Sequence, residues 1–184
     1  EIALRIDQTL TQDATGTMAY LEFETMGLKR VKTERSVAYI DHNTLQSGFE
    51  NADDHRYIQT VAKKHGVRFS RPGNGICHQV HLERFGKPGK TLLGSDSHTR
   101  YGAIGTMGVG EGGPELVKQL LSKTYDVDAP KVVLVYLQNA PKQGIGPQDV
   151  AIALVGETFK DGFVKNCILE FAGPGVKNLS MDFR

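Results

Sequence analysis

The stretch PELVKQLLSKTYDVDAPKVVLVYL, residues 114–137, places a predicted helix directly before a predicted strand. Pro114 suits the first turn of a helix that we expect to run to Tyr125, with its apolar residues at helical spacing. These apolar residues are Leu116, Val117, Leu120 and Leu121. Lys131 to Leu137 is a β-branched run typical of a buried parallel strand. A helix followed by such a strand favours an α/β fold.

The same alternation extends on both sides of this stretch. Further helices are predicted from Asp13, as N-cap, to Gly27, from Asp53 or Asp54 to Gly66, and from Pro147 to Phe159. Further strands are predicted at Val37–Ile40, Thr91–Leu93 and Asn166–Phe171. The residues expected to face inward are Met18, Tyr20 and Leu21 in the first helix and Tyr57, Ile58, Val61 and Ala62 in the second.

This order of elements predicts a layered α/β/α domain with a largely parallel sheet. Ala129-Pro130 is the best candidate for a boundary. We therefore expect a first α/β domain over residues 1–130 and the beginning of a second α/β domain over residues 131–184.

Composition narrows the class of partner. The formal net charge is +1, from 22 basic and 21 acidic residues, with no run of either sign, which argues against a nucleic-acid surface. We see no apolar stretch of membrane-spanning length and no signal peptide, and so expect no membrane partner.

The only two cysteines, Cys77 and Cys167, lie in apolar runs. We expect both to be buried structural residues in a reducing, intracellular compartment.

Polar clusters follow the predicted strands. Asp41-His42 comes after Ile40, Ser95-Asp96-Ser97-His98-Thr99 comes after Leu93, and His78 follows a third short apolar run. Ligands of open α/β sheets collect at the carboxyl ends of strands, so these residues are candidates for proton-transfer pairs or metal ligands. Each Asp-His step taken alone is also typical of a solvated turn or a helix cap.

Three other histidines and a glycine motif stand apart from these clusters. His55 and His65 are expected on the solvent side of the second helix, and His81 follows His78 by one helical turn.

Gly108-x-Gly110-x-x-Gly113 formally matches a dinucleotide fingerprint. It lacks the acidic residue at the end of the next strand, so we expect close backbone packing there instead.

Five blocks, in the same order, resemble the aconitase family. They are Gln12-Asp13-Ala14-Thr15, Asp41-His42, the run from Arg71 to Gln79, Asp96-Ser97-His98-Thr99 and Gly173-Pro174-Gly175-Val176. The resemblance covers nearly the whole chain. It implies an aconitase-type amino-terminal α/β domain within a [4Fe-4S] hydro-lyase, whose cluster iron acts as Lewis acid on a hydroxy-polycarboxylate such as citrate or isocitrate, through cis-aconitate.

The resemblance also implies roles for residues. His42 would protonate the leaving hydroxyl and be oriented by Asp41, Asp96 would pair with His78, and His98 would complete the histidine set. The residues that would bind substrate are Gln12, Thr15 and Ser97.

Departures from the family pattern limit these expectations. Cys77 and Cys167 lack the spacing of cluster ligands, so we expect the cluster cysteines beyond Arg184. We therefore expect residues 1–184 to bind no metal or cofactor. We also expect this fragment to be inactive and to need the rest of its polypeptide. Arg100-Tyr101 replaces the Pro-Asn that follows the signature in aconitases, which leaves homoaconitate or isopropylmalate open as alternatives to citrate.

Two readings outside the hydro-lyase class also stay open. One is a mononuclear metallohydrolase that uses His42, His78, His98, Asp41 and Asp96 as ligands. The other is a non-catalytic binding module, for instance for RNA, which the near-neutral charge disfavours. The expected compartment is the cytoplasm, or the mitochondrial matrix in a eukaryote.

Overall fold

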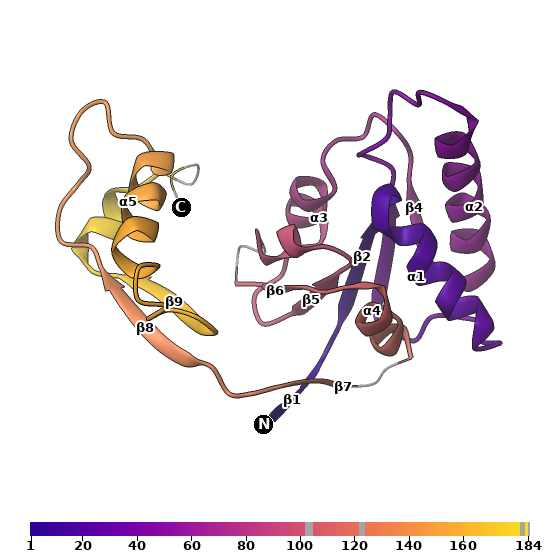
Figure 1. Ribbon diagram of the computed structural model, residues 1–184, viewed down its shortest axis with the longest axis horizontal. Coiled ribbons are helices and arrows are strands. Elements are labelled where there is room, and N and C mark those ends of the chain that lie inside the picture. The colour runs from indigo at the N-terminus through magenta and orange to yellow at the C-terminus, as the bar shows by residue number, and fades with distance from the viewer. Residues whose placement is uncertain (102–104, 122–123, 181–182, 184) are drawn as a thin grey trace. The chain divides into compact units, whose positions relative to one another are not determined.

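The computed structural model describes residues 1–101, 105–121, 124–180 and 183. It forms two compact units, one from Ala3 to Asp126 and one from Val127 to Arg184 together with Glu1–Ile2. Each unit has its own parallel strands and helices (Figure 1). Within the described residues, no helix combines the length and the apolar character that a membrane crossing requires.

The first unit is built on a five-stranded parallel sheet in the order β4-β3-β2-β5-β6. Its strands are β2 (Gln8–Gln12), β3 (Arg35–Tyr39), β4 (Arg68–Ser70), β5 (Thr91–Gly94) and β6 (Met107–Gly110). The chain places β3 and β4 on one side of β2 and then β5 and β6 on the other. Strand order therefore reverses between β2 and β5, and such a switch point is where open α/β sheets bind ligands.

Helices cover both faces of this sheet. They are α1 (Asp13–Thr25), α2 (Phe49–His65), α3 (Cys77–Phe85) and α4 (Gly113–Leu120), with a short 3₁₀ helix η1 (Ser97–Tyr101). One apolar cluster joins α1, α2 and α4 to Ala38 and Leu93, and a second joins α3 to Leu10, Val37 and Leu92. Adjacent strand residues thus point to opposite faces, and the predicted α/β/α layering is confirmed.

The central strand β2 is unusual because most of its buried residues are polar. Thr9 bonds Ser36 at 2.6 Å, and Thr11 bonds the Tyr20 hydroxyl at 3.0 Å. Gln8 accepts a bond at 2.8 Å from a ring nitrogen of His81. Such pairing offsets the cost of burying polar groups and explains why a strand with one apolar residue can lie at the centre of the sheet.

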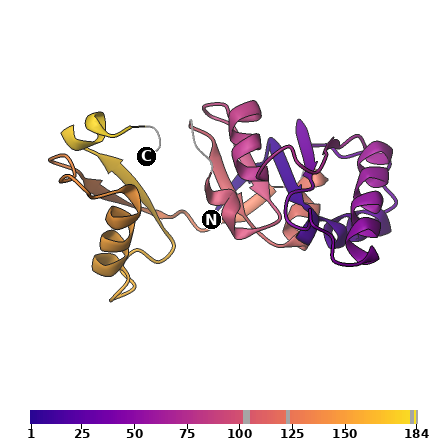
Figure 2. The ribbon, with the colours of Figure 1, turned by 90° about the horizontal axis from the view of Figure 1, so that it is seen from above.

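The second unit contains β8 (Lys131–Tyr136), α5 (Pro147–Thr158), β9 (Cys167–Ala172) and a 3₁₀ helix η2 (Pro174–Asn178). β8 and β9 pair in parallel, from Lys131 opposite Cys167 to Tyr136 opposite Ala172, and lie side by side in Figure 1 and Figure 2. A separate two-stranded sheet pairs β1 (Ile2–Arg5) with β7 (Thr124–Val127).

Several sequence-based expectations about the elements were wrong. Met18 and Leu21 are exposed, and of the three residues expected to face inward on α1 only Tyr20 is buried. The second helix begins at Phe49 rather than Asp53, although it ends as predicted at Gly66, whose φ of 80° is left-handed. The helix from Pro114 ends at Leu120, residues 122 and 123 lie outside the described residues, and Tyr125 lies in β7.

Burial in the second unit also differs from expectation. The run Lys131–Tyr136 is a parallel strand, as predicted, but Val132, Leu134 and Tyr136 are exposed, because a sheet of only two strands buries little of its surface. Cys77 is buried as expected, whereas Cys167 is only partly buried on β9.

Candidate functional site

The candidate site lies at the carboxyl edge of the sheet, at the reversal between β2 and β5. Asp13 directly follows β2, Asp41 comes two residues after β3, and Ser95 directly follows β5. The Thr15 hydroxyl at the start of α1 bonds the Ser95 hydroxyl at 2.5 Å. Residues far apart in the sequence therefore meet because three parallel strands end at the same edge.

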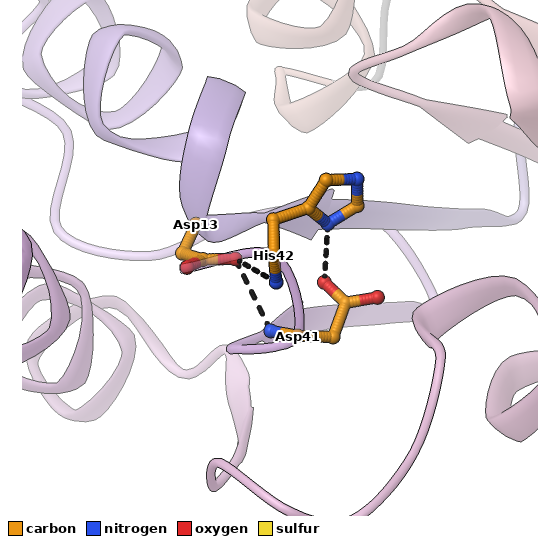
Figure 3. Close-up of side chains that lie close together, drawn as sticks. All are labelled: Asp13, Asp41 and His42. Carbon is orange, nitrogen blue, oxygen red and sulfur yellow. Dashed lines mark hydrogen bonds and ion pairs between the residues drawn. The ribbon is translucent and has the colours of Figure 1, made fainter. Parts of the chain in front are cut away.

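Asp41 and His42 form the first acid–imidazole pair (Figure 3). Nδ1 of His42 lies 2.9 Å from Oδ1 of Asp41, whose side chain is only 4% exposed, while that of His42 is 42% exposed. The second oxygen, Oδ2, accepts the backbone N–H of Cys77 at 2.6 Å. A carboxylate held in this way fixes the ring so that Nδ1 faces Asp41 and Nε2 is left for a proton-transfer partner.

Asp13 holds the turn that carries this pair. Its Oδ1 accepts the backbone N–H groups of Asp41 at 3.1 Å and His42 at 2.9 Å (Figure 3). Its Oδ2 accepts the backbone N–H of Asn43 at 2.8 Å. Burial raises the pKa of Asp13, but these three bonds and one with His55 outweigh burial, so the pKa lies below its usual value. Asp13 is therefore a buried anion at neutral pH. It is the first residue of α1 rather than the predicted N-cap, which is Gln12.

Asp96 forms the second group, with two imidazoles. Its Oδ2 lies 3.0 Å from Nδ1 of His98 and 3.3 Å from Nε2 of His78, and its Oδ1 accepts the Thr99 hydroxyl at 3.1 Å. Burial raises the pKa of Asp96, but the charge on His78 and the bonds from His98 and Thr99 outweigh it and lower the pKa. The imidazole of His98 is 80% exposed, whereas that of His78 is largely buried.

Two glycines allow the Asp96 turn to lie close to the sheet. A Cβ on Gly94 would lie 1.8 Å from Oγ1 of Thr99, and one on Gly110 would lie 2.1 Å from the Asp96 carbonyl oxygen. The Gly108–Gly113 motif falls on β6 and at the start of α4, so Gly110 serves close packing, as predicted.

The start of α3 links the two groups. The backbone N–H of Cys77 bonds Asp41, and the next residue, His78, pairs with Asp96. Burial, together with the charge of Asp41, raises the pKa of the Cys77 thiol, which is therefore protonated. His78 was expected after a strand, and it lies instead in the first turn of a helix.

The predicted substrate-binding residues differ in their surroundings. Oε1 of the buried Gln12 has no hydrogen-bond partner among the described residues, and the same holds for Nε2 of His78, whose contact with Asp96 is an ion pair without hydrogen-bond geometry. Thr15 is bonded to Ser95, and Ser97 is exposed. The structure thus gathers all five predicted catalytic residues and these three around one edge of the sheet.

Comparison with known proteins shows the family to which this chain belongs. A profile of the Aconitase family (aconitate hydratase) matches residues 1–184. The chain belongs to the aconitase family. The mitochondrial aconitate hydratase of Schizosaccharomyces pombe is 34% identical over 97% of this chain and 24% of its own length. The mitochondrial homocitrate dehydratase of Saccharomyces cerevisiae is 34% identical over 97% and 24%.

The family relatives are much longer than this chain. A 3-isopropylmalate dehydratase large subunit of Archaeoglobus fulgidus is 31% identical over 100% of this chain and 44% of its own length. The chain thus spans about a quarter of the two fungal relatives and less than half of the archaeal one.

An aconitase-type [4Fe-4S] cluster does not fit the cysteines of this chain. The sequence has only two cysteines, Cys77 and Cys167, whereas such a cluster is held by thiolates from more cysteines than these. Cys77 is also wholly buried, and the pKa of its thiol is raised. Among the described residues, the one group of three candidate ligands for a metal ion is Asp13, Asp41 and His42, and both oxygens of Asp13 already accept hydrogen bonds. The five-residue ligand set of a metallohydrolase is not gathered into one such group.

Sequence reasoning missed two residues of this aconitase-family site, Asp13 and His55. His55 and His65 were both expected at the surface, and both are buried. His55 lies against Asp13, whereas His65, at the end of α2, contacts Lys29 and Glu24 and lies outside the site. Asp13 was assigned only a helix cap. The signal that was available for Asp13 is its position: it directly follows QTLTQ, which goes unrecognised as a strand because alternating Thr and Gln do not give an apolar pattern.

Proposed function

We propose that this chain supplies the general acid and part of the substrate site of a hydro-lyase that removes water from, and returns water to, a hydroxy-polycarboxylate. The observation that carries the proposal is the exposed imidazole of His42, oriented by the nearly buried carboxylate of Asp41. Membership of the aconitase family supports the same reaction class.

In the dehydration direction, His42 is the general acid. Its Nε2–H gives a proton to the hydroxyl group as the C–O bond breaks, and the electron pair of that bond leaves with oxygen as water. A base from outside this chain takes the proton of the neighbouring C–H bond, whose electron pair forms the C=C bond. Asp41 stabilises the imidazolium before transfer and keeps the Nδ1–H in place afterwards.

Asp96, His78 and His98 form the second part of the proposed site. The anionic Asp96 orients both imidazoles toward the place where water is released and returned. The neutral groups of Gln12, Thr15 and Ser97 would bind substrate carboxylates or their waters. The orphaned Oε1 of Gln12 is an acceptor, so it supports a donor there, namely such a water or the substrate hydroxyl.

The rest of the protein would provide what these residues lack. In the whole protein a [4Fe-4S] cluster, on cysteines other than Cys77 and Cys167, would supply Lewis-acid chemistry. We favour citrate and isocitrate, interconverted through cis-aconitate, as substrates. Homoaconitate and isopropylmalate are the alternatives, since a homocitrate dehydratase and a 3-isopropylmalate dehydratase large subunit match this chain at 34% and 31% identity, against 34% for an aconitate hydratase. The compartment we propose is the cytoplasm or, in a eukaryote, the mitochondrial matrix.

The test uses the full-length protein, reconstituted anaerobically with iron and sulfide. Hydration and dehydration of citrate, isocitrate, homoaconitate and isopropylmalate are followed together with the visible absorption of the cluster. The variant His42→Asn should lower kcat by about 10²- to 10⁴-fold, the contribution of a general acid. His65→Gln, a buried histidine on α2 that contacts Lys29 and Glu24, is the control that should leave kcat unchanged.

Two results would contradict this proposal. One is a cluster-bearing protein whose activity on these acids is the same with and without His42. The other is stoichiometric binding of zinc or manganese by residues 1–184 together with hydrolase activity, which would establish the metallohydrolase instead.

A further inference from the structure

The loop that carries His42 is held at only a few points. Residues 41–48 join β3 to α2, and most of them are exposed. The first three backbone N–H groups of the loop bind Asp13. Farther along, Gln46 adopts a φ of 47°, a left-handed conformation that is rare for a residue with a side chain, and its amide reaches back to His55. A loop with so little packing depends on these polar attachments for its shape.

His55 connects both attachments. It lies on α2, is buried, and brings Nε2 to 2.9 Å from Oδ2 of Asp13 and Nδ1 to 3.2 Å from Nε2 of Gln46. Because the Gln46 amide nitrogen can only donate, Nδ1 accepts, and the ring proton is on Nε2, which donates to Asp13. One neutral tautomer therefore satisfies every partner of this ring.

We propose that His55 is a positioning residue for His42, acting through Asp13 and Gln46. The inference rests on the proposed function of His42. His55 contributes the fourth hydrogen bond to a buried carboxylate whose other three bonds hold the backbone of residues 41–43. Without His55, Asp13 loses a donor and can rotate or admit water, and the turn that aims the His42 imidazole loses its fixed geometry.

His65 provides a matched control within the same helix. It is buried like His55, and its ring packs edge-on against Phe23 while its nitrogens contact the Lys29 carbonyl oxygen and Glu24. None of these contacts involves the 41–48 loop. A general loss of α2 stability would therefore follow from changing either histidine, whereas misplacement of His42 would follow only from changing His55.

The experiment compares His55→Leu, His55→Gln, Gln46→Ala and His65→Gln in the full-length protein. Two quantities are measured: kcat and KM for the preferred acid, and amide hydrogen exchange of the segment containing residues 41–43. His55→Leu should lower kcat by about 100-fold with little change in KM, the effect of a displaced reacting group, and should lose protection at residues 41–43. His55→Gln keeps an N–H that can donate to Asp13 and should recover most of both.

Gln46→Ala covers the case in which His55→Leu does not fold, because Gln46 is exposed and its removal frees only one end of the loop. It should reduce kcat and protection by less than His55→Leu, and His65→Gln should change neither. Unchanged kcat and unchanged protection in the His55 and Gln46 variants would overturn the proposal, as would an equal loss in His65→Gln. An unmutated protein inactive on all four acids would overturn the proposed function alone, since the exchange comparison still decides whether His55 holds the loop.

Discussion

The two units of this chain are made from similar sequence patterns, yet burial differs greatly between them. In the first unit, strands β2 and β3 are almost wholly buried, and helices cover both faces of the sheet. In the second unit, no residue of α5 is buried, and among the described residues from Val127 onward only Gly175 is. Every candidate site residue lies in the first unit, so chemistry and burial coincide.

This difference shows that a run of β-branched residues does not by itself determine whether the strand is buried. Val37 and Ala38 lie in a strand with a neighbour on each side, while Val132 and Leu134 lie in a sheet of two strands and are exposed. Parallel strands normally have both faces covered. Within the second unit, a cavity of about 350 Å³ between α5, β9 and η2 is lined largely by apolar side chains. Fixed side-chain geometry of the kind that Asp13 shows is therefore expected only in the first unit.

The comparison predicts its largest effect at two phenylalanines. Phe23 on α1 is fully buried, whereas Phe159, at the end of α5, is 73% exposed. Phe23→Ala should lower the free energy of unfolding by about 3–5 kcal/mol, because it leaves a cavity in the core. Phe159→Ala should change it by about 0.5 kcal/mol or less, as exposed positions usually do. Urea denaturation of each variant measures the difference, and equal losses would show that the second unit has a core of its own.

A smaller effect is expected from pH, through His81 beneath the site. Burial, with the charges of Arg35 and His78, lowers the pKa of His81 to about 4. The unfolded chain therefore binds the proton more tightly than the folded chain does. As pH falls from about 6.5 to about 4, the free energy of unfolding decreases by at most about 3 kcal/mol.

The change His81→Leu should remove this part of the pH dependence. It should also cost about 1–3 kcal/mol at pH 7, because Tyr39 and Gln8 lose their buried partner. Unfolding free energies measured from pH 4 to 7 test both effects. Parallel pH curves for the variant and the unmutated protein would mean that folding does not lower the pKa of His81.

Two glycines are expected to give effects of opposite sign, and the effect at Gly156 is the smallest of all. A Cβ at Gly94 would lie 1.8 Å from Thr99 Oγ1, so Gly94→Ala should cost about 1–3 kcal/mol and displace the Asp96 turn. A Cβ at Gly156, inside α5, meets nothing within 4 Å, so Gly156→Ala should stabilise by about 0.5–1 kcal/mol. Thermal unfolding distinguishes the two. A stabilising Gly94→Ala would mean that the turn after β5 moves aside easily.

Much of the fold was predictable because its signals are local. The strands near Val37 and Leu93 are marked by short apolar runs, and helices α2 and α4 by apolar residues at helical spacing. Helices α1 and α5 are marked by residues typical of helix ends. β2 was not predictable, because its polar residues are buried against hydrogen-bond partners that lie elsewhere in the sequence. The pairs are Gln8 with His81, Thr9 with Ser36 and Thr11 with Tyr20. The exposure of Met18 and Leu21 likewise depends on which face of α1 the sheet receives.

The candidate site was predictable in its residues but not in its supports. Asp41-His42 and Asp96–His98 stand out as motifs after predicted strands, and the structure brings them to one edge. Asp13 and His55 could not be assigned, because a buried carboxylate that binds three loop amides has no signature in its own neighbours. The roles of the motif residues stay predictions until the variants are measured.

The bond between Thr15 and Ser95 also implies a delay during synthesis of the chain. It joins residues that are 80 positions apart, across the junction of β2 with β5. A chain made from its amino end at about 5–20 residues per second must grow for several seconds after Thr15 before Ser95 and Asp96 exist. Until then the edge of β2 that will pair with β5 is unpaired. The growing chain already contains the Asp41-His42 pair but not yet the Asp96 group.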